Sequence, residues 1–250
     1  MLTKAEILLY SKLNQKKYRK QESLFVAEGK RLVQEGLNSR FQPKLVGFTQ
    51  EFADKETEFI SNLKKESYRL EIIRNQDFLK ITSTKSPQGI LAVFEIPSKA
   101  EDVIKDKLII GLENISDPGN LGTILRSCVW FGIKTVIINE ECADIYNPKV
   151  LRASMGAVFK LDIREGINLI NSIDEMKKKD YHAILADMNG KDYRKADFNK
   201  KTILTFCNEA NGPSQNLKDI CDSVITIPQK GDIESLNVAA AAAVILSVIE

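Results

Sequence analysis

The chain has 250 residues, which is enough for one large domain or two of ordinary size. Hydrophobic residues make up 43% of the sequence and charged residues 28%, a composition typical of soluble globular proteins that excludes a disordered or fibrous chain. The 36 basic and 34 acidic side chains leave a formal net charge of +2, so binding to nucleic acid would require local basic patches.

The densest basic cluster near the amino terminus is NQKKYRK at residues 14–20. A solvated helix face explains such a cluster as well as a nucleic-acid contact does. The preceding residues include an acid and lack an apolar core followed by a cleavage site, so no secretory signal is expected. The apolar run VAAAAAVILSVI at 238–249 is shorter than the ~18 residues of a membrane span. It fits a buried helix better.

Strand-like and helix-like segments alternate along the chain, which predicts an α/β fold with a mostly parallel sheet. In the first part we predict strands at 24–29, 44–49, 68–73 and 89–96, and helices at 29–40 and 55–67. A polar, charged stretch containing a proline then indicates a linker. We therefore predict a small domain over 1–96, a linker over 97–106 and a larger domain over 107–250.

The larger domain has predicted strands whose continuous apolar character fits a sheet covered on both faces. They are expected at 107–115, 135–140, 159–163, 182–188, 202–208 and 223–229. Helices are predicted at 120–132, near 147–156, near 168–180 and from about 235 to the end of the sequence.

The potential metal ligands are few. Cys128, Cys142, Cys207 and Cys221 have neither CxxC nor zinc-finger spacing, and we expect them to be reduced thiols of a cytoplasmic protein. His182 is the one histidine of the chain, which argues against a zinc site or a histidine-based triad. No metal is predicted.

The loop NISDPGN, at residues 114–120, leads into a helix with an apolar stripe from Leu121 to Cys128. Arg126 lies off that stripe and near the expected start of the helix. Because helical side chains point back toward the amino terminus, Arg126 could join the free N–H groups of the first turn in an anion site. A simple ion pair between Arg126 and Asp117, or another acid, is an equally open interpretation.

A second loop, TFCNEANGPSQN at 205–216, follows a predicted strand. It places Glu209 at a strand end, where open α/β sheets bind their ligands. The Asn211–Gly212 pair is also an ordinary turn signal, so a polar turn without a function is the alternative.

The third loop, IPQKGDIESLNVAAAAAV at 227–244, contains Ser235, which is either a helix N-cap or a site residue. Asn237 is a poor helix former that we place just inside the last helix. The five alanines after it permit close approach of another backbone, in the core or in a second subunit. Neither the dinucleotide fingerprint GxGxxG nor a Walker loop is present, so a nucleotide-like cofactor would need a different arrangement.

Taken in order, the three loops resemble the signature motifs of the SpoU/TrmH branch of the SPOUT methyltransferases. These enzymes use S-adenosylmethionine to methylate the ribose 2′-hydroxyl of rRNA or tRNA. The segment NPKVLRASMGAVFKL is similar to one that the family carries between its first two motifs. The residues that match the motifs are Asn114, Asp117, Asn120, Gly122 and Arg126 in the first loop, Glu209 in the second, and Ser235 and Asn237 in the third.

The resemblance extends to the first part of the chain, where LFVAEGKRLVQEGL and TKSPQGILAVFE are similar to an L30e-like RNA substrate-binding domain. It shifts the interpretation of the basic cluster toward RNA contact. The residues concerned are Lys16, Lys17, Arg19 and Lys20. The family also implies a deep trefoil knot in the C-terminal domain and a homodimer with the cofactor pocket beside the subunit interface.

The resemblance implies roles for individual residues. Arg126 is the main catalytic residue, which grips the RNA phosphate beside the target ribose, and Asn120 fixes the loop or the substrate. Glu209 holds backbone or the partner subunit's arginine, while Ser235 and Asn237 order the third loop and the substrate. The expected cofactor contacts are Thr205, Phe206, Cys207, Asn208, Gly212, Ile227, Pro228, Leu236 and Asn237.

One position departs from the family pattern. Cys207 stands where the second motif usually has glycine, and its side chain is expected to narrow the cofactor pocket.

The predicted function is S-adenosylmethionine-dependent 2′-O-methylation of structured RNA, with 23S rRNA favoured over tRNA. A non-catalytic RNA-binding or ribosome-assembly protein that keeps the fold is an alternative. A nucleotide-dependent dehydrogenase or kinase is another, against which the missing phosphate loops argue.

Overall fold

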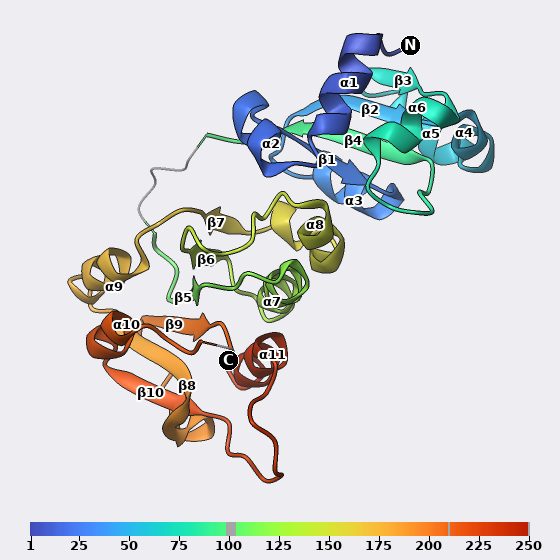
Figure 1. Ribbon diagram of the computed structural model, residues 1–250. Helices are drawn as coiled ribbons and strands as arrows, with labels where there is room; N and C mark the ends of the chain where they lie inside the picture. Colours follow the sequence, from blue (N-terminus) through green and yellow to red (C-terminus); the bar gives the residue numbers. More distant parts are fainter. Residues whose placement is uncertain (99–103, 210, 250) are drawn as a thin grey trace. The chain divides into compact units, whose positions relative to one another are not determined.

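The computed structural model describes residues 1–98, 104–209 and 211–249, which form two compact units (Figure 1). The first unit comprises Met1–Ser98 and Asp144–Phe159, and the second comprises Lys99–Ala143 and Lys160–Glu250. The chain thus returns to the first unit for 16 residues after the predicted linker. Residues 99–103 of that linker lie outside the described residues. Within the described part of the chain, no helix is long and apolar enough to cross a membrane.

The first unit is built on a four-stranded mixed sheet of order β1-β4-β2-β3. Its strands are β1 (Leu24–Glu28), β2 (Pro43–Phe48), β3 (Leu70–Ile72) and β4 (Ile90–Glu95). Strand β4 runs antiparallel to both β1 and β2, and β2 and β3 pair in parallel. The expectation of a mostly parallel sheet is therefore wrong for this unit. Alternating helices and strands do not fix strand direction, because a helix can also lead into an antiparallel neighbour.

Helices cover this sheet because its central strands are apolar on both faces. The helical elements of the unit are α1 (Lys4–Lys12), α2 (Lys16–Glu22), α3 (Lys30–Leu37), α4 (Gln50–Lys55), α5 (Thr57–Leu63), α6 (Asn75–Ile81), α8 (Pro148–Ser154) and the 3₁₀ helix η1 (Ala157–Phe159). Alternate residues of β1 point to opposite faces: Leu24 and Val26 pack with α1 and α6, and Phe25 faces an aromatic cluster.

That aromatic cluster fixes the returning segment. The ring centroid of Phe25 lies 4.6 Å from that of Tyr146 and 5.6 Å from that of Phe94. Phe94 in turn lies 5.4 Å from Phe159. A buried ion pair supports the same segment, since Arg19 on α2 is 2% exposed and donates from Nε and Nη2 to Asp144 Oδ2 at 3.1 and 2.6 Å.

The second unit contains a six-stranded sheet of order β10-β8-β9-β5-β6-β7 in which every pair is parallel, as predicted for this part of the chain. Its strands are β5 (Leu108–Glu113), β6 (Thr135–Ile138), β7 (Asp162–Arg164), β8 (His182–Asp192), β9 (Thr202–Cys207) and β10 (Ser223–Thr226). The strand predicted from residue 159 begins only at Asp162, because Phe159 ends a 3₁₀ turn and is buried in the first unit.

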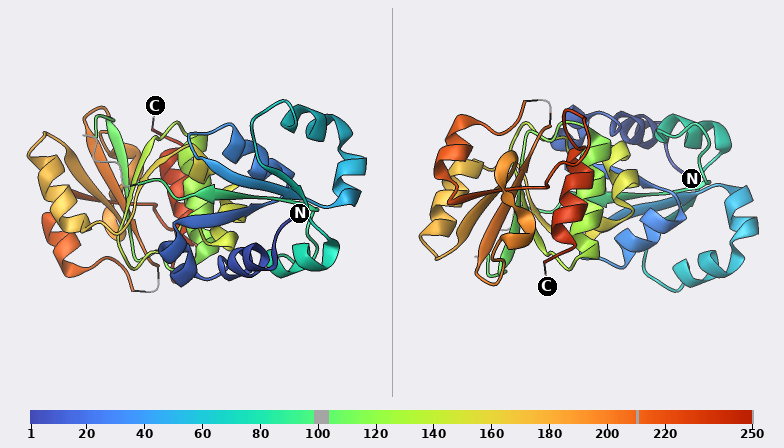
Figure 2. Two further views of the ribbon diagram at one scale, coloured as in Figure 1. Left: turned by 90° about the horizontal axis from the view of Figure 1, so that it is seen from above. Right: turned by 90° about the horizontal axis from the view of Figure 1, so that it is seen from below.

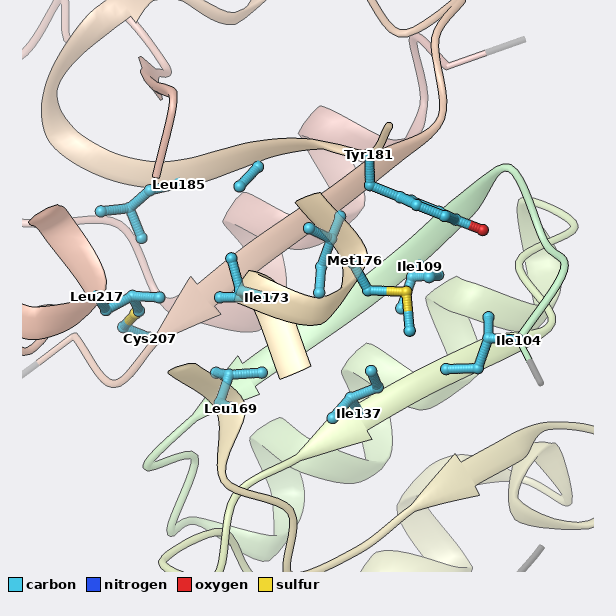
Figure 3. Close-up of a cluster of buried hydrophobic side chains, with 12 residues drawn as sticks. Ile104, Ile109, Ile137, Leu169, Ile173, Met176, Tyr181, Leu185, Cys207 and Leu217 are labelled. Atoms are coloured by element: carbon cyan, nitrogen blue, oxygen red, sulfur yellow. The ribbon is translucent and has the colours of Figure 1, made fainter. Parts of the chain in front are cut away.

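Helices lie on both faces of this sheet. They are α7 (Pro118–Trp130), α9 (Leu169–Lys177), α10 (Gln215–Ile220) and α11 (Val238–Leu246), with a short 3₁₀ helix η2 (Tyr193–Lys195). Figure 2 shows α11 beside α7 on one face and α9 with α10 on the other. Between α9, α10 and the sheet lies an apolar cluster that includes Ile173, Leu185 and Leu217 (Figure 3). The trefoil knot implied by the resemblance stays a prediction.

We expect Arg19→Ala to lower the free energy of unfolding by about 3–5 kcal/mol, since it leaves the Asp144 carboxylate buried without its cation. Urea denaturation measures this loss. The double substitution Arg19→Met with Asp144→Leu should recover most of it, because no buried charge remains. A loss below about 1 kcal/mol for Arg19→Ala would contradict this account.

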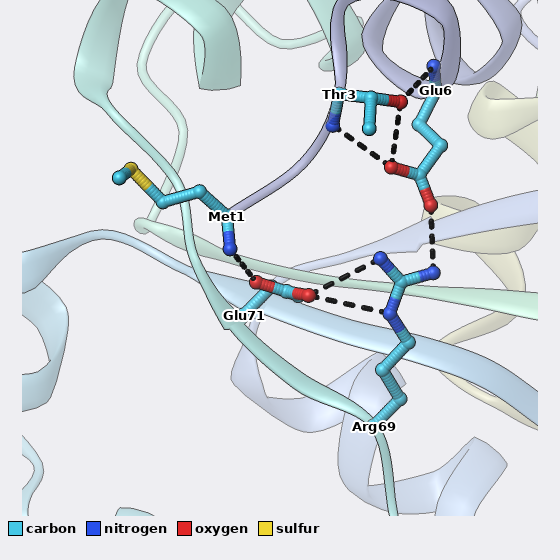
Figure 4. Close-up of polar contacts among 5 residues, drawn as sticks. All are labelled: Met1, Thr3, Glu6, Arg69 and Glu71. Carbon is cyan, nitrogen blue, oxygen red and sulfur yellow. Dashed lines mark hydrogen bonds and ion pairs between the residues drawn. The ribbon is translucent and has the colours of Figure 1, made fainter.

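The amino-terminal helix is tied to the edge strand by charged contacts (Figure 4). Glu6 Oε1 accepts a hydrogen bond of 2.7 Å from Arg69 Nη1, and Glu6 Oε2 accepts from the backbone N–H and hydroxyl of Thr3, each at 2.8 Å. Arg69 also donates to Glu71 Oε1. The hydrogen bond from Arg69, followed by those from Thr3, lowers the pKa of Glu6 to about 2.

A lowered carboxylate pKa means that ionised Glu6 stabilises the fold. This contribution is complete above the ordinary value of 4.5 and is lost as the pH falls through about 2. At pH 7 we expect Glu6→Gln to be less stable than the wild type by at most about 1 kcal/mol, because solvent screens this exposed pair. The difference, followed by thermal unfolding, should shrink steadily below pH 4.5. A difference that stays constant down to pH 2 would refute an electrostatic origin.

Candidate functional site

The three loops singled out in the sequence all belong to the second unit. The first follows β5 and the second follows β9, and these strands are neighbours whose last residues, Glu113 and Cys207, are paired in register. The third connects β10 to α11. Because parallel strands present their carboxyl ends at one edge, the first two loops start side by side, where open α/β sheets bind ligands.

One side-chain amide joins all three loops. Asn237 Nδ2 donates to Asn120 Oδ1 at 3.0 Å and lies 3.5 Å from Glu209 Oε1. Asn120 Nδ2 donates to the same Glu209 oxygen at 3.1 Å. The remaining atom of the amide, Asn237 Oδ1, accepts from the backbone N–H groups of Ala239 and Ala240. Asn237 is therefore the N-cap of α11. The prediction that it lies just inside the helix is wrong, and so is the interpretation of Ser235 as the cap.

The second loop has a further anchor in the end of β5. Glu113 is buried, and its two carboxylate oxygens accept from the backbone N–H and the hydroxyl of Ser214 at 2.9 and 2.6 Å. Asn208 Nδ2 donates to the carbonyl of Asn114 at 3.1 Å. These contacts hold the second loop near both of its ends: Asn208 is bonded to the first loop, and Ser214 is bonded to the last residue of β5.

A pocket of about 450 Å³ opens beside the second and third loops. Seven of the nine predicted cofactor residues line it: Phe206, Cys207, Asn208, Gly212, Ile227, Pro228 and Leu236. Glu209 and Ser235, predicted as catalytic, line it as well. Thr205 and Asn237 do not. Thr205 is buried within β9, and its hydroxyl has no hydrogen-bond partner among the described residues.

The pocket also includes residues that the sequence analysis missed. Ala186, Asp187 and Met188 come from β8, and the side chain of Asp187 is 17% exposed. The signal was available, since the apolar stretch before them ends in an acid at the carboxyl edge of a predicted parallel strand. His182, by contrast, stands at the other end of β8 and does not line this pocket.

Arg126 is placed differently from our expectation. Helix α7 begins at Pro118, so Arg126 is its ninth residue, about 12 Å along the axis from the first. The anion site formed with the free N–H groups of the first turn stays a prediction. The ion pair with Asp117 is wrong, since exposed Arg126 makes no ion pair within the described part of the chain. Asp117 caps the helix by accepting a hydrogen bond from the backbone N–H of Asn120.

The predicted RNA contacts on α2 divide into two groups. Lys16, Lys17 and Lys20 are exposed, as a surface for RNA requires. Arg19 points inward to its ion pair with Asp144 and is removed from the proposed RNA-binding set. Helical periodicity accounts for the difference, since one side of any packed helix faces the core.

Comparison with known proteins identifies the family of this site. Residues 107–247 match the SpoU rRNA Methylase family, and residues 4–92 match an MRM3-like substrate binding domain. The chain belongs to the SpoU rRNA methylase family. The predicted resemblance, the methyltransferase class and the α/β fold with an N-terminal substrate-binding domain are confirmed.

Three relatives of this SpoU methylase match it over nearly their full length. The chain is 30% identical to the 23S rRNA (guanosine(2553)-2'-O)-methyltransferase RlmP of Bacillus subtilis over 95% of its own length and 92% of that protein. The structure of a putative RNA methyltransferase of the TrmH family from Porphyromonas gingivalis aligns with a TM-score of 0.87 at 30% identity, covering 99% and 98% of the two chains. An AdoMet-bound rRNA methyltransferase from Sinorhizobium meliloti aligns with a TM-score of 0.85 at 25% identity, covering 100% and 95%.

Cys207, which replaces the usual glycine of the SpoU family's second motif, is shared between core and pocket. It lines the pocket and also belongs to the apolar cluster, where Figure 3 shows it beside Leu217. Burial raises the pKa of its thiol, and the neighbouring Glu113 carboxylate adds to the shift. The thiol therefore stays protonated at neutral pH and acts as a small apolar group.

The two roles of Asn237 can be separated by substitution. Asn237→Ala removes both the cap and the bonds to the other loops, so we expect a loss of about 1 kcal/mol in unfolding free energy from the cap alone. Asn237→Ser keeps a capping oxygen but is too short to reach Asn120 or Glu209. Thermal unfolding should place Asn237→Ser within about 0.5 kcal/mol of the wild type. Equal losses in both variants would show that the inter-loop bonds, rather than the cap, stabilise the helix end.

Proposed function

We propose that the chain uses S-adenosylmethionine to methylate a ribose 2′-hydroxyl in rRNA, 23S rRNA in preference to tRNA. The observation that carries this proposal is the pocket of about 450 Å³ beside the hydrogen-bonded cluster Asn120–Glu209–Asn237. Its volume is in the range of cofactor sites, which are mostly apolar with a few placed polar groups. The names of the rRNA methyltransferase relatives and the AdoMet-bound structure support the same substrate and cofactor.

The pocket walls suit this cofactor chemically. Ile227, Pro228 and Leu236 offer apolar surface for the adenine ring. Asp187 supplies a carboxylate that can accept hydrogen bonds from ribose hydroxyls. When bound, the sulfonium of S-adenosylmethionine supplies an already activated methyl group, so the protein's task is mainly alignment of the acceptor.

Arg126 is proposed to serve the RNA rather than the cofactor. It is exposed on α7, the helix that carries Asn120, and makes no ion pair within the described part of the chain. An unpaired guanidinium is suited to a phosphate, which it can hold through two parallel hydrogen bonds. Gripping the phosphate next to the target ribose would orient the 2′-hydroxyl and stabilise the charge that develops on its oxygen.

We also propose a homodimer in the cytoplasm. Trp130 on α7 is 81% exposed and Val248 after α11 is 42% exposed, an apolar exposure that a subunit interface on this face would cover. The four cysteines are free, and burial raises the pKa of each thiol, as fits a reducing compartment.

Calorimetric titration with S-adenosylmethionine tests the cofactor and the role of Arg126 together. We expect micromolar binding by the wild type and by Arg126→Ala, with methyl transfer to rRNA reduced at least about 100-fold in the variant. Arg126→Lys is the matched control, since it keeps the charge without the planar fork and should retain part of the activity. Lost cofactor binding in Arg126→Ala would assign the arginine a structural role. No binding by any of them would favour a non-catalytic RNA-binding protein.

The variants Cys207→Gly and Cys207→Ala test how the cysteine in place of the usual motif glycine affects cofactor binding. We expect Cys207→Gly to bind S-adenosylmethionine as tightly as the wild type or more tightly, because the Cβ and sulfur no longer narrow the pocket. The same variant should lose about 1–2 kcal/mol of unfolding free energy with its packing in the apolar cluster. Clearly weaker binding by both variants would instead make the cysteine an adapted cofactor contact.

A further inference from the structure

A second hollow, of about 220 Å³, lies on the same unit where β8, η2 and β10 meet. It shares only Ile225 with the larger pocket. Three lysines, Lys191, Lys195 and Lys200, stand at its walls together with Ser223. All three are exposed, and none forms an ion pair with a described residue.

The carboxylates near these lysines do not neutralise them. Asp192 also lines the hollow, but Arg194 Nε donates to both of its oxygens, at 2.9 and 3.2 Å. The hydrogen bonds from Arg194 lower the pKa of Asp192 to about 2, so this carboxylate is ionised and already paired. Among the described residues that line the hollow, Asp197 is the one carboxylate left to offset the lysines, so the hollow keeps an excess of positive charge.

The backbone of β8 brings the lysines to this place. Leu185 pairs with Val224, but the next pair is Lys191 with Ile225, so residues 186–190 bulge out of the sheet. The strand crosses β10 at Gly190, where an added Cβ would lie 2.5 Å from the carbonyl carbon of Ile225. Any side chain at position 190 would clash with the backbone of Ile225, so the close approach of β8 to β10 requires glycine there.

The same bulge connects the hollow to the cofactor pocket. Asp187 and Met188 within the bulge line the pocket, and Lys191, the first paired residue after it, lines the hollow. The hollow also reaches His182 and Ser223, the first residues of β8 and β10, so an RNA strand that occupied both places would follow β8 from one edge of the sheet toward the other. Ser223 adds a hydroxyl beside the lysines, 3.0 Å from His182 Nε2.

We propose that this lysine-lined hollow is a second RNA-backbone site, which holds a phosphodiester of the substrate outside the pocket of the methylated nucleotide. Lysine ammonium groups bind phosphate as point charges, without regard to base identity. A space of about 220 Å³ accepts a phosphate with its ribose, and the three lysines at its walls supply the charge that a phosphodiester requires. The inference rests on the proposed function in that the substrate is RNA.

The test compares two charge-matched triple variants. One carries Lys191→Gln, Lys195→Gln and Lys200→Gln. The control carries Lys105→Gln, Lys134→Gln and Lys179→Gln, which remove three exposed lysines of the same unit outside the hollow. Binding of in vitro transcribed rRNA fragments is measured by fluorescence anisotropy over a range of salt concentrations, and S-adenosylmethionine binding by calorimetry.

We expect the hollow variant to lose about tenfold or more in RNA affinity, and its salt slope to fall by about 2, because up to three phosphate contacts disappear. The control should change less than threefold, and both should bind S-adenosylmethionine like the wild type. Equal RNA affinity in the two variants would overturn the proposal and leave the proposed function intact. Absence of RNA binding by the wild type would overturn both.

The lysines could instead bind a small phosphate compound. Titration with pyrophosphate distinguishes such a ligand from the phosphates of RNA. Pyrophosphate bound tightly by the wild type and lost in the hollow variant, with RNA affinity unchanged, would assign the hollow to a small ligand and refute the RNA site.

Discussion

The side-chain amide of Asn237 is the contact on which the site depends. Its oxygen caps the last helix, and its nitrogen bonds to residues of the two other loops, Asn120 and Glu209, which lie 117 and 28 positions earlier in the chain. The loops that follow β5, β9 and β10 are thereby joined to one another by hydrogen bonds. The pocket has a defined wall because the start of α11 cannot move without breaking this set of bonds.

The sheet explains why such a contact can form. Parallel strands β5 and β9 end together, so their loops share an edge, and β8 bulges over β10 to add the far wall. Close approach at Gly190 and burial of Glu113 keep these walls in register. In this arrangement the proposed cofactor pocket and the lysine-lined hollow both follow from the bulge of β8 beside β10.

Much of this site could be predicted from the sequence, because its residues stand at the ends of apolar strands and in ordered motifs. Contacts over long separations could not: Arg19 lies in a basic cluster that looks solvated, and its ion pair with Asp144 spans 125 residues. Arg126 was misplaced since the helix begins two residues earlier than its apolar pattern suggests. The antiparallel direction of β4 in the first sheet could not be predicted, because the apolar pattern of a strand is the same whichever way the strand runs.

The most direct test of the account is the identity of the methylated product. Purified protein is incubated with in vitro transcribed 23S rRNA and S-adenosylmethionine labelled in its methyl group, and the RNA is digested to nucleosides and separated by chromatography. The account predicts label in a 2′-O-methylated nucleoside and in no methylated base. Label in a base, or no transfer by a protein that binds both the cofactor and the RNA, would contradict it.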